Sequence, residues 1–189
     1  MSMEIIYETH SVTTDNEAGV ASGWLHGKLS PQGRALAQHL GERRSADRIA
    51  AVFVSDLRRA VETAEIAFGD TGIPVHRDAR LRECNYGDLN GASVTAVAAQ
   101  KRARVDTPFP AGESYEQVVD RTEAFLRDLV RDWDGARVVV IAHSANLCAL
   151  EHLLHGKSLA EVVTAPFAWQ EGWLFRVPTG WLGRQLAHH

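Results

Sequence analysis

The chain of 189 residues is 45% hydrophobic and 23% charged, with a formal net charge of −4 at pH 7. This composition is typical of a globular protein, and the negative balance excludes a general basic field for nucleic acid or an anionic membrane. No stretch approaches the ~18 apolar residues of a membrane span, and the amino terminus lacks the basic-then-apolar pattern of a signal peptide. Two cysteines, Cys84 and Cys148, are too few for a disulfide framework. We therefore expect a reduced, cytoplasmic protein with one domain over residues 1–189.

Short apolar runs alternate with segments of helical periodicity along the chain. In chain order, the pattern predicts a strand at 5–7, a loop to 29, a helix at 31–46, a strand at 49–54, a helix at 56–68 and a strand at 73–75. A loop at 81–91 and helices at 94–104 and 115–134 follow, then a strand at 137–142, a helix at 147–154, a short helix after 158 and strands at 169–177 and 181–186. This alternation predicts an α/β fold, a three-layer α/β/α sandwich with a mostly parallel central sheet and an antiparallel edge.

Several predicted helices have recognisable start signals. Ser30 before Pro31 is typical of an N-cap followed by proline at the first helical position. Ser114 and Gln117 have the spacing of a capping box at the start of the longest helix. Ser55 is predicted to cap the helix that follows the second strand.

Two histidines stand where predicted strands end. His10 follows the strand at 5–7 after two polar residues, and His143 directly follows the strand at 137–142. Ligands of open α/β sheets bind at the carboxyl ends of the strands. If the two strands are neighbours, the two imidazoles lie side by side.

Four polar groups at strand ends or in loops form a chemically coherent set. A neutral imidazole such as His10 can attack phosphorus, and an arginine such as Arg59 can hold phosphate with its rigid donor fork. A second imidazole, His143, can donate to the phosphoryl oxygens, and the carboxylic acid of Glu83 can protonate a departing alkoxide. Taken singly, each residue also has a structural interpretation, and both histidines could be hydrogen-bonded core residues.

The motifs around these residues resemble those of the histidine phosphatase superfamily, which contains the cofactor-dependent phosphoglycerate mutases. The family's first motif is Arg-His-Gly-Glu-Thr with an asparagine six residues after the histidine; here THSVT occupies 9–13 and Asn16 has the same spacing. Four further segments resemble family motifs in the same order: SDLRRAVETAE at 55–65, LRECNYGDLNG at 81–91, GESYEQVVDR at 112–121 and VVVIAHSAN at 138–146. The resemblance covers roughly residues 5–150.

The resemblance implies a phosphoglycerate mutase-like fold and a phosphatase that acts through a phosphohistidine on a small phosphorylated molecule. His10 is then the nucleophile, Arg59 and His143 clamp the phosphoryl group, and Glu83 is the general acid and then the base. Asn16 lines the pocket. The family needs no metal and no organic cofactor for this chemistry. Neither nucleic acid nor membrane is an expected partner, and the oligomeric state and the substrate are not predicted.

Two further positions belong to the expected substrate-binding set, Thr9 and Ser144. Thr9 stands where the family motif has arginine, and Val12 stands where it has glutamate. A hydrogen bond with a charged group is worth about 1.5–3 kcal/mol, so its loss from a transition state predicts a roughly 10- to 150-fold slower enzyme. Another cation could restore the charge, and Lys28, Arg58 and Arg82 are the candidates.

Two alternative functions remain open at this stage. A non-catalytic relative could bind a phosphorylated ligand or partner, which Thr9 favours, and a mutase could transfer the phosphoryl group as the phosphoglycerate mutases do. Among the aromatic residues, Trp24 and Tyr86 are expected near the substrate. The alternating Trp169, Trp173 and Phe175 are interpreted as a packed edge strand.

Overall fold

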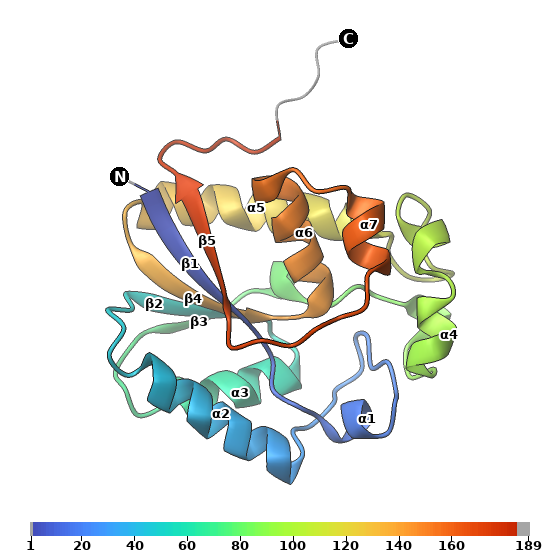
Figure 1. Ribbon diagram of the computed structural model, residues 1–189, viewed down its shortest axis with the longest axis horizontal. Coiled ribbons are helices and arrows are strands. Elements are labelled where there is room, and N and C mark those ends of the chain that lie inside the picture. The colour runs from blue at the N-terminus through green and yellow to red at the C-terminus, as the bar shows by residue number, and fades with distance from the viewer. Residues whose placement is uncertain (1, 185–189) are drawn as a thin grey trace.

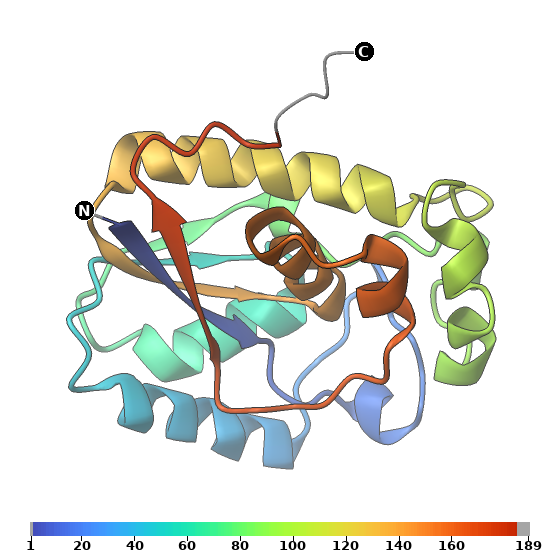
Figure 2. The ribbon, with the colours of Figure 1, turned by 45° about the horizontal axis from the view of Figure 1, so that its top comes forward.

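Five strands form one twisted sheet at the centre of the molecule (Figures 1 and 2). The computed structural model describes residues 2–184. The strands are β1 (Ser2–Thr9), β2 (Ala51–Val54), β3 (Val75–Arg77), β4 (Arg137–Ala142) and β5 (Trp173–Pro178), in the spatial order β3-β2-β4-β1-β5. All neighbouring pairs are parallel except β1 with β5. The predicted α/β sandwich with a mostly parallel sheet and an antiparallel edge is confirmed.

Helices cover both faces of this sheet (Figures 1 and 2). The α-helices are α1 (Thr14–Glu17), α2 (Pro31–Arg44), α3 (Arg58–Phe68), α4 (Val94–Ala98), α5 (Tyr115–Trp133), α6 (Ser144–His155) and α7 (Leu159–Thr164). Helices α2 and α3 pack on one face, and α5 and α6 pack on the other. Within the described residues, no helix is both long enough and apolar enough to cross a membrane.

Successive side chains of β1 point to opposite faces of the sheet, so the strand packs against the helices on both sides. Ile6 packs with the apolar side chains of α2 and α3, whereas Ile5 and Tyr7 pack with those of α5 and α6. All three side chains are buried. The strand therefore sits firmly in the sheet, and its carboxyl end is held in a fixed position.

The register between β1 and β4 brings the two histidines together. Thr9 pairs with Ala142, so that His10 and His143 come next on adjacent parallel strands. The backbone N–H of His10 donates to the Ala142 carbonyl at 2.9 Å and continues the ladder by one residue. The prediction that these strands are neighbours is confirmed.

The carboxyl-terminal strands differ from the sequence prediction. Only β5 forms where strands at 169–177 and 181–186 were predicted, and residues 169–172 precede it as an irregular segment. Residues 181–184 form no strand, and 185–186 lie outside the described residues. The alternation of Trp169 with Trp173 and Phe175 made the segment before β5 resemble a strand. Instead, Trp169 lines the cavity described below.

Several other boundaries were wrong by a few residues, and three of them have a clear consequence or cause. The third strand pairs from Val75 rather than from residue 73, because the proline at position 74 has no N–H for the ladder. The helix predicted at 94–104 breaks after Ala98 and resumes as a 3₁₀ turn at Lys101–Arg104. Helix α3 begins at Arg58 with Leu57 as its N-cap, so that Ser55 is not the cap.

Candidate active site

A cavity of about 420 Å³ opens where β1 ends. That volume lies within the range of small-molecule pockets. Nearly all of the predicted site residues line it: Thr9, His10, Asn16, Arg59, Glu83 and Ser144. The exception is His143, which lies beneath the cavity and is fully buried.

His10 is oriented by its own backbone neighbourhood. Its Nδ1 is 2.7 Å from the Ser11 carbonyl oxygen, and a carbonyl can only accept, so Nδ1 carries the proton. Burial, and after it the positive charge of Arg59, lowers the pKa of His10 to about 3. The ring is therefore neutral at physiological pH, and its Nε2 carries an available lone pair. This is the state that a nucleophilic imidazole requires.

His143 lies against His10 and is held in place by two hydrogen bonds. The two ring centroids are 5.0 Å apart. Nε2 of His143 shares a 2.9 Å hydrogen bond with Ser55 Oγ, and the His143 carbonyl accepts from the Tyr7 hydroxyl at 2.6 Å. Burial, and after it the positive charge of Arg59, keeps the pKa of His143 well below its usual value. Its Nδ1 has no hydrogen-bond partner within residues 2–184, so this nitrogen still has an unused bonding capacity.

Arg59 lies in the first turn of α3 and holds the loop that forms one wall of the cavity. Its Nη1 donates to the Leu25 carbonyl at 2.9 Å, and its Nη2 donates to the Gly23 carbonyl at 2.7 Å. Only 3% of its surface is exposed, and this burial lowers its pKa while the Glu83 carboxylate acts in the opposite direction. Each bond uses one N–H of its nitrogen, so the guanidinium still has donors for an anion in the cavity.

Glu83 lies against the start of α6. Its Oε1 accepts from the backbone N–H groups of Cys84, at 2.8 Å, and Ala145, at 3.3 Å. Its Oε2 accepts from Ser144 Oγ at 3.1 Å. An amide at the start of α6, a position that commonly binds an anion, is thus directed at the protein's own carboxylate, and Ser144 orients Glu83 as well as lining the cavity.

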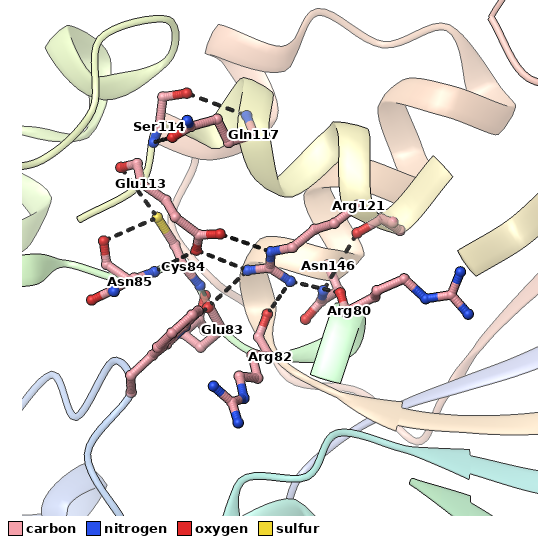
Figure 3. Close-up of polar contacts among 12 residues, drawn as sticks. Arg80, Arg82, Glu83, Cys84, Asn85, Glu113, Ser114, Gln117, Arg121 and Asn146 are labelled. Atoms are coloured by element: carbon pink, nitrogen blue, oxygen red, sulfur yellow. Dashed lines mark hydrogen bonds and ion pairs between the residues drawn. The ribbon is translucent and has the colours of Figure 1, made fainter. Parts of the chain in front are cut away.

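A partly buried network around Arg121 of α5 fixes the segment that presents Glu83, and the sequence did not reveal it (Figure 3). The Arg121 guanidinium donates to the carbonyls of Arg80, Arg82 and Glu83 at 2.6–2.9 Å. It also forms a bidentate ion pair with Glu113 at 3.0 and 3.1 Å. Both residues fall in the GESYEQVVDR segment, but nothing local in that segment indicates that its one arginine reaches across to Glu83.

Asn16 and Thr9 complete the polar part of the cavity. Asn16 forms a capping box with Thr13 at the start of α1, in which its Oδ1 accepts from the Thr13 N–H at 3.0 Å. The short turn of α1 therefore fixes the amide at the cavity wall. Thr9 is half-buried and contributes a neutral hydroxyl.

None of the three cations expected to compensate for Thr9 lines the cavity. Lys28 and Arg58 are exposed, and Arg82 forms a bidentate pair with Asp56 at 2.7 Å. Instead Lys101, in the turn after α4, lines the cavity and makes no ion pair within the described part of the chain. No local pattern indicates this role for Lys101, because its position depends on the break after α4.

The aromatic lining also differs from expectation. Tyr86 lines the cavity, but Trp24 does not; its indole donates to the Glu83 carbonyl at 2.7 Å and lies under the Arg82 guanidinium. Trp169, which we expected in a packed strand, lines the cavity together with Phe167. Of these two rings, Trp169 lies in the segment that sequence analysis assigned to the sheet, and Phe167 lies just before it.

Comparison with known proteins agrees with this geometry. Residues 9–168 match the family model described as the histidine phosphatase superfamily (branch 1). The chain is 36% identical to glucosyl-3-phosphoglycerate phosphatase of Mycolicibacterium vanbaalenii over 162 residues, which cover 78% of this chain and 72% of that protein. It is 29% identical to the 2,3-bisphosphoglycerate-dependent phosphoglycerate mutase of Cytophaga hutchinsonii, with 77% and 74% covered. The solved structure of Bacillus stearothermophilus YhfR superposes with a TM-score of 0.81 at 26% identity and covers 91% of this chain and 90% of that one. The chain belongs to the histidine phosphatase superfamily.

Proposed function

We propose that the protein hydrolyses a small phosphomonoester through a phosphohistidine formed on His10. The supporting observation is the neutral His10, with Nδ1–H bonded to the Ser11 carbonyl, in one cavity with Arg59 and Glu83. The Nε2 lone pair attacks phosphorus while the ester P–O bond breaks, and Glu83 gives its proton to the leaving alkoxide. Water then attacks the phosphohistidine, Glu83 takes the proton from that water, and phosphate leaves.

The remaining groups stabilise the transferring phosphoryl group in this proposal. Arg59 supplies a positive charge and its unused N–H donors, and His143 offers the unpaired Nδ1. Thr9 offers a hydroxyl without charge, so we expect a slower enzyme than one with two arginines around the phosphate. The free thiols of Cys84 and Cys148 are compatible with a reducing compartment, and we propose a cytoplasmic location.

The test of the proposal is direct detection of the phosphohistidine. Wild-type protein mixed with p-nitrophenyl phosphate and quenched rapidly in alkali should gain one phosphate on the peptide that contains His10, measured by mass spectrometry. The label should be lost in acid, as phosphoramidates are. Its absence, together with absence of turnover, would favour a relative that binds a phosphorylated ligand without hydrolysing it.

The pH dependence of this step follows from the pKa of His10. Because the folded-state pKa of about 3 lies below the usual 6.5, the nucleophile stays neutral as the pH falls from 8 to 5. Phosphohistidine formation should therefore show no loss centred near pH 6.5, once the ionisation of the substrate phosphate is corrected for. The same shift lowers stability as the pH falls from 6.5 toward 3, because the unfolded chain binds the proton and the folded chain does not.

Glu83→Gln tests the proton donor. The amide can still accept the hydrogen bonds from Cys84 and Ala145, but it cannot protonate an alkoxide. We expect kcat/KM for an alkyl phosphate to fall about 10²- to 10⁴-fold. The rate with p-nitrophenyl phosphate, whose leaving group needs no proton, should fall far less. Glu65→Gln, at an exposed ion pair with Arg77, is the control. An equal loss on both esters would assign the proton transfer to another group.

Phosphoryl transfer to a second alcohol is the other candidate function, and the phosphoglycerate mutase relatives favour it. The same phosphohistidine would then partition between water and an acceptor. Adding 3-phosphoglycerate to the turnover assay distinguishes the two functions: a hydrolase releases inorganic phosphate in proportion to p-nitrophenol, whereas a mutase-type enzyme transfers part of it to the glycerate.

A further inference from the structure

The cavity extends beyond the reacting groups along an apolar wall. Phe167 and Trp169 belong to the segment between α7 and β5, which runs beside α2 (Figures 1 and 2), and Leu36 and Leu40 of α2 line the same cavity. Phe167 is 53% exposed and Trp169 is 55% exposed. Large apolar side chains left open beside a polar site are typical of a surface that binds a ligand.

The wall is held in place at its carboxyl-terminal end. Arg44 donates to the Glu171 carbonyl at 2.9 Å and to the buried carboxylate of Glu8 at 2.8 Å. Gly172 follows with a φ of +87°, a backbone conformation that favours glycine, and a Cβ there would meet the Arg44 guanidinium and the Glu8 carboxylate. Phe167 in turn packs beside Trp173, the first residue of β5, with ring centroids 6.2 Å apart. Because the segment is anchored, a ligand gains contact with the rings without having to order them.

The described charged residues around the cavity offer no free charge beside the apolar wall for a charged ligand group to bind. Arg43 also lines the cavity, but an ion pair with Glu8 at 2.8 Å neutralises its charge, and its buried Nε has no hydrogen-bond partner among residues 2–184. Lys101, which makes no ion pair within the described residues, follows α4, where Val94 and Val97 add apolar surface to the cavity. A carboxylate or a sugar next to Phe167 and Trp169 would lose water and find no free charged partner there.

We propose that Phe167 and Trp169, with Leu36 and Leu40, form a subsite for a flat apolar group on the alcohol side of the phosphate ester. This inference rests on the proposed function and names its substrate class: monoesters of aromatic or similarly planar apolar alcohols, rather than phosphorylated glycerates or amino acids. The phosphoryl group lies at His10, and the apolar group contacts the aromatic wall.

The experiment compares 1-naphthyl phosphate with phenyl phosphate, which differ mainly in apolar area. Wild-type kcat/KM should be about 10-fold higher for the naphthyl ester, chiefly through a lower KM. Trp169→Ala should bring the ratio close to the ratio of the intrinsic reactivities, and Trp169→Phe should restore part of the preference. Leu174→Ala is the matched control, because Leu174 is also 53% exposed but lies on β5 and does not line the cavity. An equal efficiency for both esters in the wild type, or a preference that survives in the Trp169→Ala, Phe167→Ala double variant, would overturn the inference.

A binding measurement separates failure of the subsite from failure of the enzyme. Calorimetry with 1-naphthylmethylphosphonate and with methylphosphonate needs no turnover. Tighter binding of the naphthyl compound to wild type, lost in Trp169→Ala, supports the subsite even in a protein that does not hydrolyse esters. Equal binding of both compounds overturns the subsite, and a protein that still forms phospho-His10 would then retain the proposed function.

Discussion

Replacement of His10 by alanine is expected to abolish phosphatase activity, with a loss of p-nitrophenyl phosphate turnover on the order of 10⁴-fold or more. The reason is geometric as well as chemical. Among the described residues that line the cavity, His10 is the only histidine, and none is a cysteine that could act as the nucleophile in its place. The hydrogen bond from Nδ1 to the Ser11 carbonyl leaves the Nε2 lone pair available. Stopped-flow or steady-state release of p-nitrophenol, with mass detection of the phosphorylated peptide, measures both consequences.

The controls for His10 separate chemistry from folding. His39→Ala removes an exposed imidazole from α2 and should leave turnover unchanged. Thermal unfolding should show that His10→Ala remains folded, because His10 adds one neutral ring to the cavity wall and no ion pair. Added imidazole should restore part of the activity by occupying the space of the missing ring. Full activity in His10→Ala would move the nucleophile to another group and refute the mechanism.

Arg59→Ala is expected to reduce kcat/KM by about 10²- to 10³-fold, the loss typical of one removed transition-state donor. It should also lower the free energy of unfolding by about 2–5 kcal/mol, since the carbonyls of Gly23 and Leu25 would lose their buried donor. The double effect arises because one guanidinium both faces the cavity and holds the loop that forms its wall. Denaturant unfolding and kinetics on the same samples measure the two losses.

The neighbouring arginine provides a matched control. Arg58 has the same side chain one residue earlier, is exposed and makes no ion pair among the residues of the described chain, so that Arg58→Ala should change neither stability nor turnover appreciably. Arg59→Lys keeps the charge but loses the fork and should fall between wild type and Arg59→Ala. If Arg59→Ala lost stability but kept its kcat/KM, Arg59 would be a structural anchor of the loop and not a phosphate ligand.

The sequence predicted the sheet and the histidine pair because both depend on local patterns. Apolar runs identify β1 and β4, and parallel strands place His10 and His143 at one edge of the sheet. Helix starts with strong local signals were also confirmed: Ser30 and Ser114 are the N-caps of α2 and α5. Ser55 was wrong as a cap, because its hydroxyl bonds to His143, a partner 88 positions away that no local rule reveals.

The features that the sequence did not reveal depend on distant contacts. Arg121 reaches the segment before Glu83, Lys101 reaches the cavity, and Trp169 lines it instead of joining the sheet. The sequence around each of these residues predicts only a solvent-exposed side chain or one packed in the sheet. The described fold, rather than any motif, brings Lys101 and Trp169 to the cavity and Arg121 to the segment that presents Glu83.

The position of β1 between β4 and β5 has a consequence for biosynthesis. The strand that carries the nucleophile leaves the ribosome first among the five, yet both of its pairing partners lie far later in the chain, from Arg137 and from Trp173 onward. At about 5–20 residues per second, the apolar run of Ile5, Ile6 and Tyr7 waits roughly 6–26 seconds for its first partner. A nascent chain therefore presents an unpaired, aggregation-prone strand for much of its synthesis, and a chain cut before β5 keeps that strand as an open edge.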